Sequence, residues 1–358
     1  STTELLWRKT ERFVWRAASR LPTKFSAALR RRVVRHPSRP EYRAPPPSPQ
    51  AVSSCAPSRQ GPASGIPSRG LGTSAYARGN TGPFAIAGRV AVAPSSAAMP
   101  AYVPTQHGDP RAPGLVLVHG TRMAGAYWQG HLATLSARFH VVTPDLPGHG
   151  ARREEPFTHA GALETIRAAI ATCAGGKAVV LGHSLGGFLA MDLAAASPER
   201  FDGLVLMGCS AIARGAKTLP YRLALALLPL FSEKTLARWN DRMLRHRYPA
   251  ALVEPQIAAG YGFGAIGPAW RAVLGRDHTL GLRRFPAPVL VLNGARDPVF
   301  RLAERRFVRA CPHARLCVIP GASHLCNLDR PAAFEAAVRT FVESVAAPAQ
   351  NRVGRCEE

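Results

Sequence analysis

Residues 179–196 read VVLGHSLGGFLAMDLAAA and show two different periodicities on either side of one serine. Residues 179–181 form a short, continuously apolar run, which is typical of a strand buried on both faces. From Phe188 onward, the apolar residues and alanines favour a helix. Ser184 lies between the two, so the stretch predicts a sharp turn from a strand into a helix, with a serine at the turn.

Glycines flank this serine at the positions where a tight turn excludes bulky side chains. Gly182 and Gly186 complete the pattern G-x-S-x-G around Ser184. A serine hydroxyl is a poor nucleophile unless the backbone exposes it and a base removes its proton. The amides at the start of the following helix would favour negative charge there. The pattern alone is weak in a chain with 32 glycines, and a close-packed structural turn is the alternative.

The rest of the chain after residue 113 repeats the same design. Short Val, Leu and Ile runs that end in glycine or a polar residue alternate with helical patterns. This alternation predicts an α/β fold with a mostly parallel, doubly wound sheet, whose functional residues lie beyond the carboxyl ends of the strands. The expected strands are 114–120, 139–150, 177–184, 201–210, 287–297 and 314–324, and the expected helices are 161–173, 187–197, 302–310 and 331–346.

A long, apolar, helical stretch interrupts the alternation between residues 211 and 285, so we expect an inserted cap over the site. Within it, YRLALALLPLF (221–231) is interpreted as core, with the lining of an apolar substrate pocket or a lid as the alternative. The segment GFGAIGPAW (262–270) contains G-x-G-x-x-G. Because no clear strand precedes it and no acidic residue follows about 20 positions later, we interpret it as a loop and not a dinucleotide site.

Together with the serine motif, four further stretches, in matching order, resemble the α/β-hydrolase family over about residues 113–345. The match is specific, except in the cap. These stretches are LVLVHGT (115–121), DLPGHG (145–150), NGARDPV (293–299) and PGASHLCNLDRP (320–331).

The resemblance implies an active site. It places the catalytic acid at Asp297 and the catalytic base at His324, with Ser184 as nucleophile. The order Ser, Asp, His is the one expected for this fold. The backbone amides of Thr121 and Leu185 would form the oxyanion hole. No cofactor and no metal are expected.

The leading functional prediction is a serine hydrolase that cleaves carboxylic esters of small to medium apolar acids through an acyl-enzyme. The apolar cap argues against a strongly charged substrate. A thioesterase, a lactonase or a carbon–carbon bond hydrolase would use the same groups, and a ligand-binding receptor that keeps an intact triad is the non-enzymatic alternative. A dehalogenase is disfavoured because that branch of the family has an aspartate where Ser184 stands.

Six other polar residues near these motifs are expected to serve the structure. The histidines should be hydrogen-bonded scaffold groups, Asp145 should brace its loop, Ser323 should pack or form hydrogen bonds, and Asp192 should lie at the core edge or in solvent. These residues are His119, His149, His183, Asp145, Ser323 and Asp192.

Charge is distributed unevenly along the 358 residues, whose formal net charge is +24. Residues 1–98 hold 16 Lys and Arg against 3 Asp and Glu and are rich in Pro, Ser and Gly, so we expect a largely disordered extension. The first methionine is Met99, which we take as the natural start of a hydrolase domain spanning 99–346. Residues 347–358 are expected to form a flexible tail.

Partners and compartment follow from the same composition. We expect a small apolar ester as the partner and no specific nucleic acid. Contact between a membrane surface and the basic, Trp-containing segment 4–35 is an alternative to a solvated tail. Seven scattered cysteines without a C-x-x-C pair predict reduced, mostly buried thiols in a cytoplasmic protein.

Overall fold

A computed structural model describes residues 102–347, and this range contains the predicted strands, helices and site residues. The basic extension (1–98), the proposed start at Met99 and the tail from 348 lie outside the described residues. All described residues belong to one compact unit.

Seven strands form one sheet in the order β1-β3-β2-β4-β5-β6-β7. All six predicted strands are present and parallel to one another, for example with Leu115 of β2 opposite Val179 of β4. The sequence analysis missed β1, a short antiparallel edge strand that pairs with β3. The strands are β1 (Thr105–His107), β2 (Gly114–Val118), β3 (His140–Thr143), β4 (Ala178–His183), β5 (Phe201–Met207), β6 (Val289–Gly294) and β7 (Ala314–Ile319).

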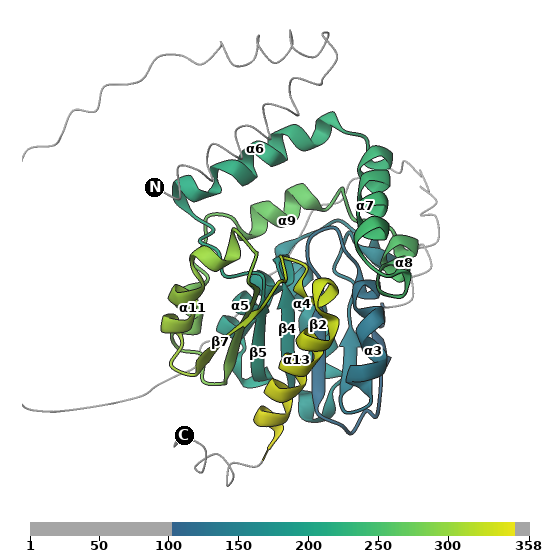
Figure 1. The fold of residues 1–358 in the computed structure, drawn as a ribbon. Coiled ribbons are helices and arrows are strands. Elements are labelled where there is room, and N and C mark those ends of the chain that lie inside the picture. Colours follow the sequence, from purple (N-terminus) through teal and green to yellow (C-terminus); the bar gives the residue numbers. More distant parts are fainter. Residues whose placement is uncertain (1–101, 348–358) are drawn as a thin grey trace, which may run out of the picture. The chain divides into compact units, whose positions relative to one another are not determined.

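Helices cover both faces of the sheet (Figure 1). Successive strand residues point to opposite faces, and the core accordingly divides into two clusters. Val116, Val180 and Leu204 pack on one face with α4 (His159–Ala171), α5 (Leu185–Ala196) and α11 (Glu304–Ala310). Leu115, Val179 and Val205 pack on the other with α3 (Gln129–Ser136) and α13 (Pro331–Ala346). The predicted doubly wound α/β fold is confirmed.

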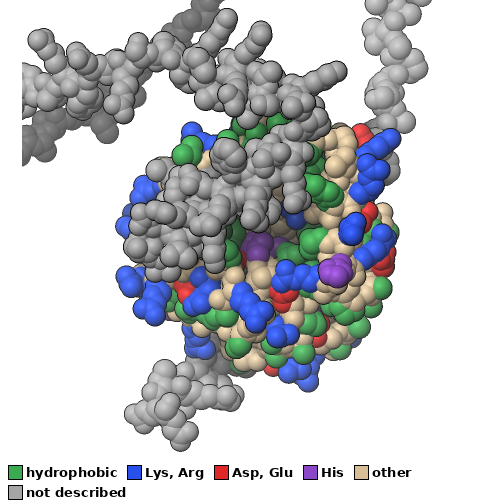
Figure 2. Space-filling view, turned by 45° about the horizontal axis from the view of Figure 1, so that its top comes forward, with side chains coloured by type: hydrophobic (Ala, Val, Ile, Leu, Met, Phe, Trp, Pro, Cys, Tyr) green, Lys and Arg blue, Asp and Glu red, His purple; other side chains and the backbone are tan. Residues whose placement is uncertain are grey.

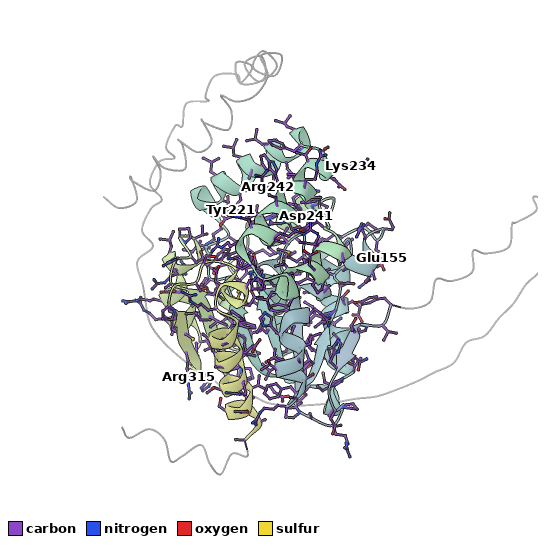
Figure 3. The ribbon with its side chains drawn as sticks, turned by 45° about the vertical axis from the view of Figure 1, so that its right-hand side comes forward. Glu155, Tyr221, Lys234, Asp241, Arg242 and Arg315 are labelled. Atoms are coloured by element: carbon purple, nitrogen blue, oxygen red, sulfur yellow. The ribbon has the colours of Figure 1, made fainter. Side chains whose placement is uncertain are left out.

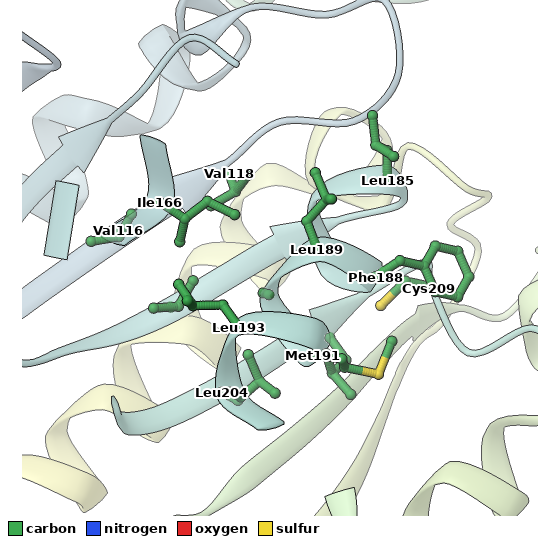
Figure 4. Close-up of a cluster of buried hydrophobic side chains, with 14 of the residues drawn as sticks. Val116, Val118, Ile166, Leu185, Phe188, Leu189, Met191, Leu193, Leu204 and Cys209 are labelled. Carbon is green, nitrogen blue, oxygen red and sulfur yellow. The ribbon is translucent and has the colours of Figure 1, made fainter. Parts of the chain in front are cut away.

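Helix α5 lies deep in the first cluster, and this fixes the turn that precedes it. Leu185, Phe188 and Leu189 are buried among side chains of the neighbouring strands and α4 (Figure 4). The small residues Gly186 and Gly187 let the first turn of α5 approach the sheet closely. Burial of these apolar side chains, at about 1.5–3 kcal/mol each, holds the start of α5 in place.

Five helices separate β5 from β6, as predicted for residues 211–285: α6 (Leu219–Leu227), α7 (Glu233–Arg247), α8 (Ala250–Ala259), α9 (Ile266–Val273) and α10 (Thr279–Leu282). Figure 1 shows α6, α7 and α9 beyond one end of the sheet. Ser232 begins α7, because its Oγ accepts a hydrogen bond from the Thr235 amide at 3.2 Å.

One interpretation within this segment was wrong, and another was correct only in part. None of residues 221–231 is buried, so the stretch is not core; Leu223 is 47% exposed. The segment 262–270 is a loop only in its first part, because α9 begins at Ile266. Pro268 is compatible with this helix because it lies in the first turn, where its missing N–H has no partner to lose.

Two properties concern the environment of the chain. Within residues 102–347, no helix combines the length and apolarity needed to cross a bilayer. The five described cysteines are free thiols; Cys317 is partly exposed, and the buried ones are Cys173, Cys209, Cys311 and Cys326. Cys55 and Cys356 lie outside the described residues.

Candidate functional site

Ser184 forms the turn between β4 and α5 in a strained backbone conformation. Its φ is +52° and its ψ is −114°, a region that residues other than glycine rarely adopt. The amide of Ser184 donates to the Met207 carbonyl at 2.8 Å, which anchors the turn to β5. A Cβ at Gly182 would lie 2.5 Å from the Gly186 carbonyl carbon, and one at Gly186 would lie 2.6 Å from the Val118 oxygen. Both glycines are therefore required, as the motif predicted.

Asp297 and His324 come together from the loops after β6 and β7. The His324 Nδ1–H donates to Asp297 Oδ2 at 2.9 Å, and the amides of Val299 and Phe300 donate to Oδ1 at 2.9 Å each. Burial would raise the pKa of Asp297, but these hydrogen bonds outweigh burial and lower the pKa. The carboxylate thus stays ionised and fixes the proton of His324 on Nδ1, which leaves Nε2 able to accept a proton.

The His324 ring lies at the end of the sheet where the serine turn is found. It stacks on Phe300 with ring centroids 4.7 Å apart, and its centroid is 4.9 Å from that of His183, the residue before Ser184. A Cβ at Gly208, after β5, would be only 2.9 Å from the His324 ring. The Ser184 hydroxyl itself makes no hydrogen bond to any residue between 102 and 347. Such contacts often tighten only when substrate binds.

The predicted oxyanion-hole amides lie at two facing turns. Leu185 is the first residue of α5, so its amide has no acceptor within the helix. The turn after β2 approaches the serine closely, since a Cβ at Gly120 would lie 3.3 Å from Ser184 Cβ. Within residues 102–347, the amide of Thr121, the next residue, donates to no backbone carbonyl. Two free amides therefore stand near the serine, one on each turn.

The predicted scaffold histidines differ in how they are held. His119 Nδ1 donates to the Gly120 carbonyl at 2.9 Å and its Nε2 accepts from the Leu146 amide at 3.0 Å. His149 donates to the Pro147 carbonyl at 2.9 Å. Burial lowers the pKa of His119 to about 4 and that of His149 to about 3, so both rings are neutral at pH 7.

His183 departs from the expectation of a hydrogen-bonded scaffold. Neither of its ring nitrogens has a partner among the described residues, and it stacks on Tyr127 with centroids 5.4 Å apart.

Asp145 braces its loop as predicted, with Oδ1 accepting from the Gly125 amide at 2.6 Å and Oδ2 from the Ala151 amide at 2.9 Å.

Two aspartates hold more contacts than the sequence indicated. Asp192 lies at the core edge, as predicted, but it also binds His159 Nε2 at 2.8 Å and His278 Nδ1 at 2.9 Å, and so joins α5 to the segment before β6. Asp329, which the sequence analysis did not single out, accepts from the amide of Ser323 at 2.6 Å and from its hydroxyl at 2.5 Å. The predicted hydrogen-bonding role of Ser323 is thus confirmed.

A cavity of about 410 Å³ lies beside the histidine loop, and its lining includes Arg247, Arg296 and Arg330. Neither Ser184 nor His324 lines it. A separate hollow is visible in Figure 2, with a histidine side chain inside it and hydrophobic side chains along part of its border.

The sequence model of the alpha/beta hydrolase family matches residues 115–337, which is more than half of the chain and contains every site residue named above. The chain belongs to the alpha/beta hydrolase family. Membership in this family places the chain among enzymes of the hydrolase class, and the strained serine turn and the aspartate–histidine pair occur on the family's fold.

Individual alpha/beta hydrolases resemble the chain over most of their own length. A pimeloyl-[acyl-carrier protein] methyl ester esterase of Nitrosomonas europaea is 28% identical over 62% of this chain and 92% of that protein. The crystal structure of a hydrolase from Pseudomonas aeruginosa is 28% identical, with a TM-score of 0.55 over 67% of this chain and 93% of the other. The enol-lactonase of Burkholderia xenovorans shares the fold, with a TM-score of 0.58 at 22% identity and coverage of 67% and 96%.

Arg122 is a further residue of this alpha/beta hydrolase that the sequence analysis did not single out. It directly follows Thr121 and has a left-handed φ of +64°. An arginine one position beyond the expected oxyanion turn was the signal available in the sequence. The clue was overlooked because arginines are abundant in this chain and usually solvated.

Proposed function

We propose that this protein is a serine hydrolase that acts through an acyl-enzyme. Its substrates are carboxylic esters of small to medium acids whose carbon chain is apolar. The observation that carries the proposal is the His324–Asp297 hydrogen bond at 2.9 Å, at the end of the sheet where the strained Ser184 turn lies. A base oriented by a carboxylate, near a serine that a sharp turn holds at the end of a strand, is the arrangement that nucleophilic acyl transfer requires.

Each group has one role in this proposal. Ser184 Oγ attacks the carbonyl carbon while His324 Nε2 takes its proton and then delivers that proton to the leaving alcohol. Asp297 holds the histidine tautomer and stabilises the imidazolium. The amides of Thr121 and Leu185 stabilise the oxyanion, and one such donor is worth about 3–4 kcal/mol of barrier. A water molecule activated by His324 then hydrolyses the acyl-enzyme.

The helices between β5 and β6 supply the apolar surroundings of the proposed substrate. Tyr221 of α6 stacks on Trp270 of α9 with centroids 4.6 Å apart. Partial burial raises the pKa of Tyr221 to about 12, and the charge of Asp297 contributes to this shift. Figure 3 shows Tyr221 together with Asp241 and Arg242 in the helical layer beyond the sheet. We therefore assign this layer the role of a cap over the site.

The relatives favour ester cleavage over the alternatives. The curated relative from Nitrosomonas europaea is named as a methyl ester esterase. A cytoplasmic location is part of the same proposal, and the free buried thiols such as Cys209 suit a reducing compartment. The proposed partner is a small ester and not a macromolecule.

A fluorophosphonate probe tests the proposal directly. We expect the probe to label the full chain at Ser184, and the Ser184→Ala variant to stay unlabelled. A series of p-nitrophenyl esters from acetate to octanoate should give turnover that depends on Ser184 and reveals the preferred chain length. If neither labelling nor ester turnover occurs, the chain is a binding module and the proposal is wrong.

A further inference from the structure

Hydrogen bonds hold Arg122 between the turn after β2, which approaches the serine, and helix α7. Its Nε donates to Asn240 Oδ1 of α7 at 3.0 Å, and the Asn240 amide group in turn donates to the Leu236 carbonyl at 2.8 Å. The backbone carbonyl of Arg122 accepts from the Gly262 amide at 3.0 Å. Both the backbone and the side chain of Arg122 are therefore fixed between the turn after β2 and the helical layer.

This cation lacks a negative partner within residues 102–347. Arg122 forms no ion pair with a described carboxylate, and its two terminal nitrogens donate to no described group. The nearby carboxylate on α7, Asp241, instead accepts from the Tyr261 hydroxyl at 2.8 Å. Burial lowers the pKa of Arg122, whereas Tyr261 and Tyr127 act in the opposite direction. An arginine stays protonated even so. Arg122 is only partly buried, and its terminal nitrogens are not among the buried polar atoms without a partner, so they remain accessible to a ligand.

The electrostatic influence of Arg122 reaches the residue beside the nucleophile. The pKa of His183 lies well below its ordinary value, chiefly because of burial and of His324, and the charge of Arg122 adds to the effect. Arg122 also follows Thr121, whose amide we assign to the oxyanion hole. A positive charge thus lies next to the turn that carries the proposed oxyanion amide, and the terminal nitrogens of the guanidinium have no hydrogen-bond partner among residues 102–347.

We propose that Arg122 binds a carboxylate of the substrate, so that the enzyme prefers esters whose apolar chain carries a second, anionic carboxyl group near the scissile carbonyl. Guanidinium and carboxylate match in a bidentate geometry, which no neutral ester group reproduces. The substrate would then supply the counter-charge that residues 102–347 do not provide. This inference rests on the proposed function, and it modifies the expectation that the apolar cap disfavours charge.

Matched pairs of small esters test the preference in the full chain. On the acyl side, the monomethyl esters of succinate, glutarate and adipate are compared with the methyl esters of the corresponding half-amides, which have nearly the same shape without the charge. On the alcohol side, acetoxyacetate is compared with acetoxyacetamide. We expect kcat/KM to favour the carboxylate about 100-fold in one of these pairs, and that pair tells which side of the ester carries the anion.

Two variants assign the preference to this side chain. Arg122→Gln should reduce the preference to about threefold or less, chiefly through KM for the anionic ester, while the neutral esters keep their rates. Arg122→Lys keeps the charge but loses the planar guanidinium that can donate two hydrogen bonds to one carboxylate. This variant should retain an intermediate preference for the anionic ester. Arg305 is the control position, because it is exposed on α11 and makes no hydrogen bond to any residue in 102–347. Arg305→Gln removes the same charge and should leave the preference for the anionic ester unchanged.

The possible failures can be told apart. Equal rates for carboxylate and amide in the unmodified chain, with turnover that still depends on Ser184, would overturn the inference and leave the esterase proposal standing. An equal loss on both kinds of ester in Arg122→Gln would also overturn it, because Arg122 would then act on the oxyanion or on folding. If no ester is hydrolysed and no probe labels Ser184, the proposed function fails first.

Discussion

At the scale of single residues, the nucleophile and the base act as one unit in the proposed reaction. Removal of either should therefore cost nearly as much as removal of both. We expect Ser184→Ala and His324→Ala each to lower kcat on the preferred p-nitrophenyl ester by about 10⁴-fold or more. Circular dichroism and the melting temperature should show an intact fold. Comparable turnover in either variant would remove the mechanism.

Asp297 is expected to contribute through the histidine and not through the substrate. Asp297→Asn keeps the shape but loses the negative charge and presents a donor where Oδ2 now accepts from His324. The asparagine favours the tautomer of His324 with its proton on Nε2, which cannot accept the serine proton. This should reduce kcat by about 10⁴-fold, with a smaller effect on KM. Steady-state kinetics on one neutral ester measure this effect. If the asparagine variant is fully active, another carboxylate orients the base.

At the scale of elements, the end of β5 leaves room for the histidine loop. Gly208→Ala would place a methyl group 2.9 Å from the His324 ring and should displace the ring, so that kcat falls at least about 100-fold. Gly175→Ala is the matched control, because Gly175 also has a positive φ but no atom within 4 Å of its added Cβ. Both variants should lose similar stability from the backbone, but only Gly208→Ala should lose activity.

The histidine loop is also tied to the helical layer through Asp329. Its Oδ1 accepts from Arg247 Nη2 at 2.8 Å and from the Tyr248 hydroxyl at 3.1 Å, while Oδ2 holds Ser323. Burial would raise the pKa of Asp329, but these hydrogen bonds and the charge of Arg247 lower it below the model-compound value of 3.8. The folded chain therefore stabilises the ionised carboxylate.

This direction of the pKa shift fixes the sign of a pH effect. A lowered pKa stabilises the fold above the unfolded pKa, and the stabilisation is lost as pH falls through the folded pKa. We expect Asp329→Asn to reduce the free energy of unfolding by about 1–3 kcal/mol at neutral pH, and this difference from the unmodified chain should shrink below about pH 4. Urea titrations at several pH values measure the difference. Asp202→Asn is the control: its carboxylate makes no hydrogen bond within residues 102–347 and burial raises its pKa, so this variant should not reduce the free energy of unfolding at neutral pH.

At the scale of the whole molecule, the site and its core belong to one compact unit. Within the described residues, the hydrogen bonds that anchor the Ser184 turn and join Asp297 to His324 connect segments of this unit. We expect a chain that begins at Met99 to melt cooperatively and to retain ester turnover within about twofold of the full chain. Calorimetry and kinetics on the purified shorter chain measure this. An insoluble or inactive product would show that the first 98 residues are required.

Local patterns in the sequence determined the layered fold and its serine turn. Strands buried on both faces are continuously apolar, and only glycine fits beside a turn as tight as that at Ser184. Both features can therefore be predicted from consecutive residues of the sequence. Strand β1 was not predicted, because an edge strand of three residues is too short to show an alternation of apolar and polar residues. The exposure of 221–231 was missed because an apolar helix shows the same pattern in a core and on a cap.

Tertiary structure alone decided which distant groups meet. Asp297 and His324 are 27 residues apart, and family resemblance predicted their pairing, but only the fold supplies the hydrogen bond and the glycine that makes room for the ring. The absence of an ion pair to Arg122 within residues 102–347 and the anchoring of Asp329 could likewise not be predicted from the sequence. A local sequence pattern indicates whether a side chain is buried. Which side chain from another element it contacts depends on how the chain returns to the same end of the sheet.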